Sequence, residues 1–122
     1  MKLYEMQQLI SATQLYGENW KELEVFTGCG ADLMSDVLAF TKDGALLLTG
    51  LTNPQVVRTA DVGGLVAIVF VRGKLPSPEA VAMAKTLNIP LFSTKCTLFE
   101  ACGILFSKGL KPCPPVGNNL EA

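Results

Sequence analysis

Three short segments hold small, hydroxyl and charged residues of the kind that bind anions: residues 28–32, 49–53 and 93–97. Each is predicted to lead from a strand into a helix, where free backbone N–H groups and the helix dipole favour a negative charge. Lys95 is the only cation in the three segments. Its hydroxyl neighbours would suit a phosphate or a carboxylate. The candidate ligand-binding residues are Gly28, Gly30, Asp32, Thr49, Gly50, Thr52, Asn53, Ser93, Thr94, Lys95 and Thr97.

The same residue types have a plainer use, because Ser, Thr, Asn and Asp cap helices and Gly is common in tight loops. No segment completes the glycine pattern of a dinucleotide fold or a P-loop. Arg58 and Arg72 are further candidates for holding an anion, and Asp32 with Asp36 could mimic a carboxylate pair. For all of these, a capping or surface role stays open beside the ligand-binding one.

Cys29 and Cys96 fall in two of these segments. If the segments converge, the two thiols could bind a metal or form a regulatory disulfide, although two thiolates without histidine make an incomplete metal site. Cys102 falls on an apolar helical stripe and Cys113 in the tail. No CxxC pair occurs, and the chain is long enough to fold without bridges. We therefore expect reduced cysteines and no bound cofactor.

Composition excludes several classes of protein. Of 122 residues, 49% are hydrophobic and 17% charged, the opposite of a disordered chain. Ten basic residues face eleven acidic ones, which predicts no binding to nucleic acid or to an anionic membrane. The chain has no histidine, and so lacks the commonest general base and metal ligand. We expect a protein that is not an enzyme.

The elements that would position these segments alternate along the chain. Residues 13–16 and 23–27 flank a turn and predict an N-terminal β-hairpin. Helices follow at the predicted caps Asp32, Asn53, Ser77 and Thr97. Buried strands lie between them, the strongest at residues 65–71. The pattern predicts one compact α/β domain, residues 1–110, whose parallel or mixed sheet is flanked by helices. Residues 111–122 are rich in Pro and Gly and predict a tail without regular structure.

The first ten residues contain Lys2 and Glu5 and lack the apolar core of a secretory signal. The longest apolar run, residues 65–71, is much shorter than the ~20 residues of a membrane helix. We expect a cytoplasmic protein without a membrane partner.

Four stretches together carry a family resemblance: residues 29–39, 48–54, 65–71 and 88–95. In this order they resemble the DRTGG domain family, in particular the stand-alone type found beside iron-only hydrogenase genes. The resemblance spans about residues 1–110. It implies a fold similar to the N-terminal domain of HPr kinase/phosphorylase and an accessory, regulatory or ligand-sensing role. It implies no catalytic residues.

Three hypotheses follow. The first is a regulatory domain that binds a small anionic ligand, such as a nucleotide, at the strand-end loops. The second is a homodimeric interaction module that serves a redox enzyme such as a hydrogenase, since apolar excess in a small chain favours interfaces. The third is an enzyme or redox carrier built on Cys29 and Cys96.

Overall fold

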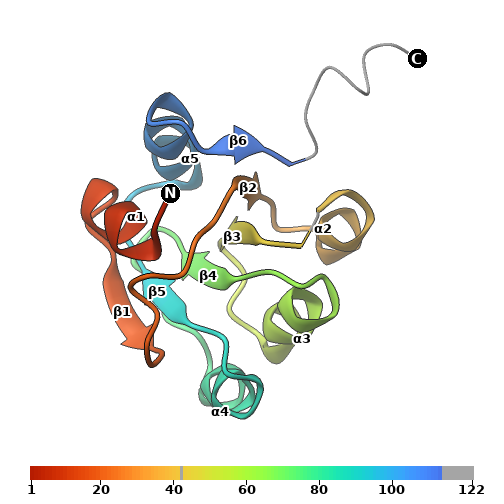
Figure 1. Ribbon diagram of the computed structural model, residues 1–122. Coiled ribbons are helices and arrows are strands. Elements are labelled where there is room, and N and C mark those ends of the chain that lie inside the picture. Colours follow the sequence, from red (N-terminus) through yellow and green to blue (C-terminus); the bar gives the residue numbers. More distant parts are fainter. Residues whose placement is uncertain (42, 114–122) are drawn as a thin grey trace.

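The computed structural model describes residues 1–41 and 43–113 as one α/β domain (Figure 1). Its described helices are α1 (Leu3–Leu9), α2 (Met34–Phe40), α3 (Pro54–Val62), α4 (Pro78–Leu87) and α5 (Leu98–Ser107). Its described strands are β1 (Thr13–Tyr16), β2 (Thr27–Gly30), β3 (Ala45–Thr49), β4 (Ala67–Phe70), β5 (Leu91–Ser93) and β6 (Lys111–Pro112).

The strands form one sheet in the order β1-β5-β4-β3-β2-β6. All neighbours are parallel except β1, which runs antiparallel to β5. The predicted α/β class with a largely parallel, mixed sheet is therefore confirmed. Because β2, β3, β4 and β5 are parallel, the loops that follow them all leave the same edge of the sheet.

The predicted N-terminal β-hairpin is wrong. β1 pairs with β5 at one margin of the sheet, whereas β2 pairs with β3 and β6 near the other. The connecting segment crosses the sheet because Trp20 and Val25 are buried in the core. The Trp20 ring lies edge-on to Phe92, with 4.9 Å between ring centroids. Burying these side chains outweighs the local turn signal at residues 17–19.

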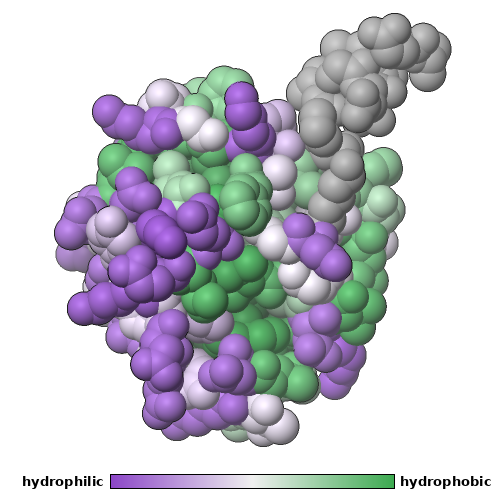
Figure 2. All heavy atoms as spheres, in the orientation of Figure 1, coloured by the Kyte–Doolittle hydropathy of each residue, from purple (hydrophilic) through white to green (hydrophobic). Residues whose placement is uncertain are grey.

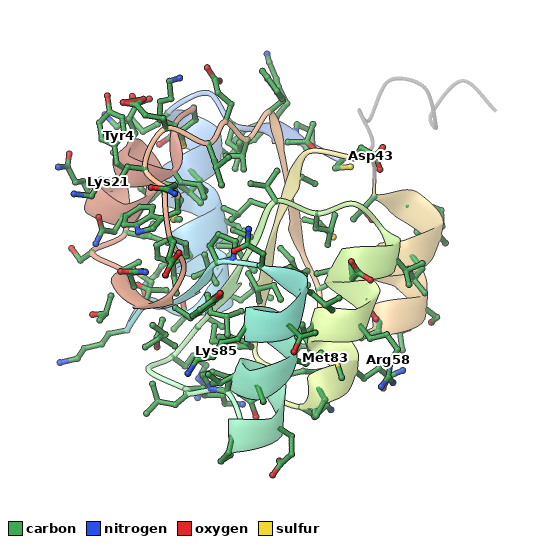
Figure 3. All side chains as sticks on the ribbon, turned by 60° about the horizontal axis from the view of Figure 1, so that its bottom comes forward. Tyr4, Lys21, Asp43, Arg58, Met83 and Lys85 are labelled. Carbon is green, nitrogen blue, oxygen red and sulfur yellow. The ribbon has the colours of Figure 1, made fainter. Side chains whose placement is uncertain are left out.

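Helices cover both faces of the sheet. Figure 1 shows α1 and α5 on one side and α2, α3 and α4 on the other, and Figure 3 shows the second group side by side. Side chains of β3 contribute to the hydrophobic clusters on both faces of the sheet. Leu46 and Leu48 pack in the cluster beneath α1 and α5 (the α1/α5 cluster), and Leu47 packs in the cluster beneath α2, α3 and α4 (the α2/α3/α4 cluster). All four residues of β4 are buried, as expected of a central strand.

The helix ends follow the predicted signals in part. Ser77 and Thr97 cap α4 and α5 with their side chains, and Asn88 ends α4 at a left-handed φ of 57°. Asn53 is the N-cap of α3 by position, without a side-chain cap bond. The prediction for Asp32 is wrong: Leu33 is the N-cap of α2. The Asp32 carboxylate bonds the neighbouring loop instead.

The sheet extends past the expected domain end. Lys111 and Pro112 form β6 and pair with Thr27 and Gly28 of β2, whereas we expected no regular structure from residue 111. The buried Leu110 side chain anchors this strand in the core. Residues 114–122 of the predicted tail lie outside the described residues. In the part of the chain that the structure describes, no helix is long and apolar enough to cross a membrane.

Candidate functional site

Two of the three predicted ligand segments meet at the carboxyl edge of the sheet. Asp32, after β2, uses one carboxylate oxygen (Oδ1) to accept two hydrogen bonds from the end of β3. The Thr49 hydroxyl donates one at 3.0 Å and the Gly50 backbone N–H the other at 2.8 Å. Thr49 also accepts a bond from Leu51 N–H, 3.2 Å away, which fixes its hydroxyl. The carboxylate therefore joins two strand-end loops.

Lys74 continues this chain of contacts to the third segment. Its ammonium donates to the Gly50 carbonyl at 3.1 Å, and its own carbonyl accepts a bond from the Ser93 hydroxyl at 2.9 Å. The order of bonding, Asp32 to Gly50 to Lys74 to Ser93, follows the strand order from β2 to β5. One connected polar network thus spans four neighbouring strands.

Beside this network lies a hollow of about 480 Å³, which we call the strand-end groove. Its volume is typical of small-molecule sites. It is bounded by the connection from α1 to β1, by the loop after β4 and by the loop after β5. The lining residues are Ile10, Ser11, Thr13, Leu15, Gly73, Leu75, Ser93, Thr94, Lys95 and Cys96.

Two predicted ligand residues in the groove, Thr94 and Ser93, use their hydroxyls for hydrogen bonds within the protein. Thr94 is 2% exposed; its hydroxyl donates to the Ile10 carbonyl at 2.6 Å and accepts from Cys96 N–H at 3.2 Å. Ser93 is 9% exposed and donates to Lys74. These hydroxyls hold the groove wall in place. Lys95 is exposed, and makes no hydrogen bond or ion pair with the described residues.

The loop after β4 forms a tight turn beside this groove. Arg72 and Gly73 have φ of 61° and 69°, and Lys74 N–H bonds the Val71 carbonyl at 3.2 Å, the features of a type I′ turn. The turn is fastened to the loop after β5, because Arg72 N–H donates to the Cys96 carbonyl and Gly73 N–H to the Thr94 carbonyl, each at 2.8 Å. Arg72, Lys74 and Lys95 therefore belong to two loops bonded to each other. Of these three side chains, Lys95 is the one that lines the groove, whereas the Lys74 ammonium is bonded to the Gly50 carbonyl.

Three other predicted residues lie at helix starts. The Thr52 carbonyl accepts a bond from Ser77 N–H at 2.9 Å and so joins the loops before α3 and α4. Asn53 is exposed at the start of α3. Thr97 and Glu100 form the predicted capping box of α5, in which Thr97 N–H donates to Glu100 at 2.9 Å. That bond lowers the pKa of Glu100 below its ordinary value.

Gly28 and Gly30 are placed away from the groove, where β2 packs against α5. A Cβ at Gly30 would lie 2.6 Å from the Cys102 sulfur, and one at Gly28 would lie 2.7 Å from Leu110. Both contacts are too close for a larger residue without movement. The structure thus explains these glycines by close packing of the last helix and the segment that follows it.

The structure does not bring Cys29 and Cys96 together. Cys29 packs against the α2/α3/α4 cluster, whereas Cys96 packs against the α1/α5 cluster on the other face of the sheet. Cys29, Cys96 and Cys102 are free thiols. Burial, followed by the neighbouring Cys113, raises the pKa of Cys29 to about 11, so its thiol is a weak nucleophile at neutral pH. Among the described residues, no group of three or more His, Cys, Asp or Glu side chains could hold a metal. The two-cysteine site is therefore a prediction that the geometry contradicts.

Arg58 also lies apart from the strand ends. It is exposed on α3 and borders a surface groove to α4 with Met83 (Figure 3). Sequence reasoning missed Lys74, although it follows the strongest predicted strand by only three residues. Ligands in open α/β sheets bind beyond the carboxyl ends of the strands, and applying this to the loop after residues 65–71 would have selected Lys74. Ser11 and Thr13 had no such signal, because β1 reaches the groove only by antiparallel pairing.

No family model matches the chain, and a search of curated proteins finds no significant match. Among solved structures, the chain is similar to the CBS and DRTGG domains of the regulatory region of a Clostridium perfringens pyrophosphatase, complexed with the activator diadenosine tetraphosphate. The TM-score is 0.71 at 19% identity, over 84% of this chain and 45% of that one. The resemblance to a DRTGG domain is thereby confirmed for the fold. This chain spans less than half of the matched regulatory region.

Proposed function

We propose that this protein is a non-catalytic regulatory domain that binds a small anionic ligand, such as a nucleotide, in the strand-end groove. The observation that carries this proposal is that the exposed Lys95 lines a groove whose walls are held in place by hydrogen bonds from the Thr94 and Ser93 hydroxyls. A rigid groove with a cation that is not engaged by the protein is suited to recognise negative charge with little loss of entropy.

The comparison supports the regulatory part of this proposal. The matched pyrophosphatase region is regulatory and is complexed with an activator that carries phosphates between two adenosines. The fold of this chain accounts for part of that region. Diadenosine tetraphosphate and simpler adenine nucleotides are therefore the first ligands to test. A cytoplasmic location, where such nucleotides are abundant, is part of the proposal.

A thermal-shift panel of nucleotides and phosphorylated metabolites tests it. A ligand at one hundred times its dissociation constant stabilises the folded state by ~2.7 kcal/mol, which raises Tm by roughly 10 °C in a domain of this size. A panel without any shift at millimolar concentration would contradict the proposal. A shift that persists unchanged in high salt would contradict the role given to charge.

A matched pair of variants locates the site. Lys95→Gln removes the cation at the groove and is expected to weaken binding about tenfold, the usual scale of one charge-assisted hydrogen bond. Lys85→Gln is the control, because Lys85 is exposed in the last turn of α4 and lies outside the groove residues (Figure 3). Equal affinities for the two variants would place the ligand elsewhere.

A second candidate function is a homodimeric interaction module that serves a redox enzyme such as a hydrogenase. Several large apolar side chains are exposed, and on the face shown in Figure 2 hydrophobic residues gather at the centre and along the side where Figure 1 places α2. Exposed apolar patches of this kind mark interfaces. Light scattering that shows a monomer at all concentrations would argue against this candidate.

A further inference from the structure

Two cysteines follow the last paired residues of neighbouring strands. Strands β2 and β6 run parallel at one margin of the sheet (Figure 1), and their last pair is Gly28 and Pro112. Cys29 and Cys113 are the next residues along the two segments. Neighbouring strands lie about 4.8 Å apart, and a disulfide needs a Cα separation of about 4.4–6.8 Å. The register of β2 and β6, continued by one residue, therefore puts these cysteines at disulfide spacing.

The two side chains also share one face of the sheet. Cys29 and Cys113 both pack against the α2/α3/α4 cluster. The Cys113 sulfur lies 3.6 Å from the carbonyl of Phe40, the last residue of α2, to which it donates. After burial, Cys113 is the next cause that raises the pKa of Cys29, an effect that needs a short distance between the two thiols. Register, face and electrostatics therefore agree that the two sulfur atoms are neighbours.

Cys102 also lies close to β2, but it approaches from the other face. Its sulfur would lie 2.6 Å from a Cβ at Gly30, and its side chain packs against the α1/α5 cluster, as that of Cys96 does. The backbone of the sheet therefore separates Cys102 and Cys96 from Cys29. Of the four cysteines, Cys29 and Cys113 are the pair that one face holds.

We propose that Cys29 and Cys113 are a redox-sensitive site, at which a small disulfide of the oxidised-glutathione class forms a bond that fastens β6 to β2. The Cys113 thiolate attacks one sulfur of the small disulfide, whose S–S bond breaks and releases a thiolate. Cys29 gives up its proton and attacks the Cys113 sulfur, which forms the protein disulfide and releases the second small thiolate. The two protein thiols lose two electrons and two protons, which reduce the small disulfide to two thiols. This inference is independent of the ligand proposed above.

The bond would change how firmly the last strand is held. Strand β6 has two residues, and its Lys111 N–H donates to the Phe26 carbonyl at 3.3 Å. A disulfide from Cys29 to Cys113 closes a loop of most of the chain and so restricts the unfolded state strongly. Oxidation should therefore raise Tm by roughly 10 °C or more. Hydrogen exchange at the Lys111 amide should become slower.

Oxidation of the full chain with excess oxidised glutathione, at about pH 8.5, tests the proposal. Peptide mapping without reduction is expected to show the segment with Cys29 linked to the segment with Cys113. Dithiothreitol should reverse the link and the rise in Tm. Cys29→Ser and Cys113→Ser, taken singly, should prevent both. Cys102→Ser is the matched control, because Cys102 also contacts β2 but from the opposite face, and this variant should still form the link.

The peptide map of the wild-type chain decides the proposal even if a variant folds poorly. A link from Cys29 to Cys96 or Cys102, a link between two chains, or glutathione adducts alone would overturn it. A Cys29–Cys113 link that leaves Tm and Lys111 exchange unchanged would overturn the fastening of β6. None of these outcomes bears on the strand-end groove, which is tested separately by ligand binding.

Discussion

The Asp32 carboxylate is hydrogen-bonded to the backbone N–H of Gly50, 18 residues later, with 2.8 Å between Oδ1 and N. The same oxygen accepts the Thr49 hydroxyl at 3.0 Å. This carboxylate could have capped α2, the helix that follows it, yet it bonds the end of the neighbouring strand. The loop geometry at the carboxyl edge thus depends on a contact between loops.

The first prediction concerns this contact. Asp32→Ala removes the acceptor for both donors and should lower the free energy of unfolding by about 1 kcal/mol, because the bonds are charge-assisted but partly exposed. Asp32→Asn keeps an acceptor oxygen and should therefore lower the free energy of unfolding by less than Asp32→Ala does. Chemical denaturation measures both, with Asp36→Ala as a control on an exposed residue of α2. If the Asp32→Ala and Asp36→Ala variants were equally stable, the contact would have no energetic role.

The second prediction concerns Gly30. Gly30→Ala puts a Cβ 2.6 Å from the Cys102 sulfur and should destabilise the fold by roughly 1–3 kcal/mol through overpacking. Adding Cys102→Ala removes the clashing atom and should recover much of the loss. The double-mutant cycle gives the coupling between the two sites. Additive effects would show that α5 moves freely away from β2.

The third prediction concerns Thr94. Thr94→Val removes the buried hydroxyl that donates to Ile10 and accepts from Cys96, leaving both backbone groups without this partner. The expected loss is about 1–3 kcal/mol. Thr86→Val is the matched control, since Thr86 is exposed on α4 and lies outside the groove residues. Because Thr94 holds the groove wall in place, Thr94→Val should also weaken the binding of any ligand that shifts the wild-type Tm. A fully stable variant would refute this role.

The fourth prediction is pH-dependent and concerns Glu100. Its pKa is lowered because Thr97 N–H donates to the carboxylate. A lowered folded-state pKa adds stability above the ordinary carboxyl pKa, and that stability is lost as the pH falls through the lowered value. Glu100→Gln should therefore be less stable than wild type near neutral pH, and the difference should shrink below the ordinary value of 4.5. Unfolding curves at several pH values test this, and a difference independent of pH would contradict it.

The fifth prediction concerns the Cys29 thiol, whose pKa is raised from 9.0 to about 11, first by burial. At neutral pH its thiolate fraction should be about one hundredth that of an unperturbed thiol, so alkylation should be correspondingly slow. The raised pKa favours the folded state below pH 9 and loses that effect as the pH rises toward 11. Mass spectrometry after timed alkylation measures the rate. Rapid alkylation of Cys29 in the folded state would contradict the prediction of a raised pKa.

Local patterns were sufficient for most of the secondary structure. Ser77, Asn88 and the Thr97–Glu100 pair mark helix ends through bonds to their own or adjacent backbone, so a few neighbouring residues decide them. The buried strand β4 is visible for a similar reason, since every one of its residues is apolar. The candidate site was harder to predict from the sequence. A hydroxyl residue such as Thr94 looks the same in the sequence whether it faces a ligand or bonds another loop.

The sequence alone determined an α/β domain without histidine, whose strand-end loops carry Lys95 and gather at one edge. Four features became visible only in the folded chain: β1 lies beside β5, Asp32 bonds the end of β3, Gly30 allows α5 to pack closely on β2, and Cys29 and Cys96 lie on opposite faces of the sheet. The difference comes from the range of the interactions. Helix caps and strand patterns are local, whereas the path of residues 17–26 and the partner of a carboxylate depend on burial and contacts between distant segments.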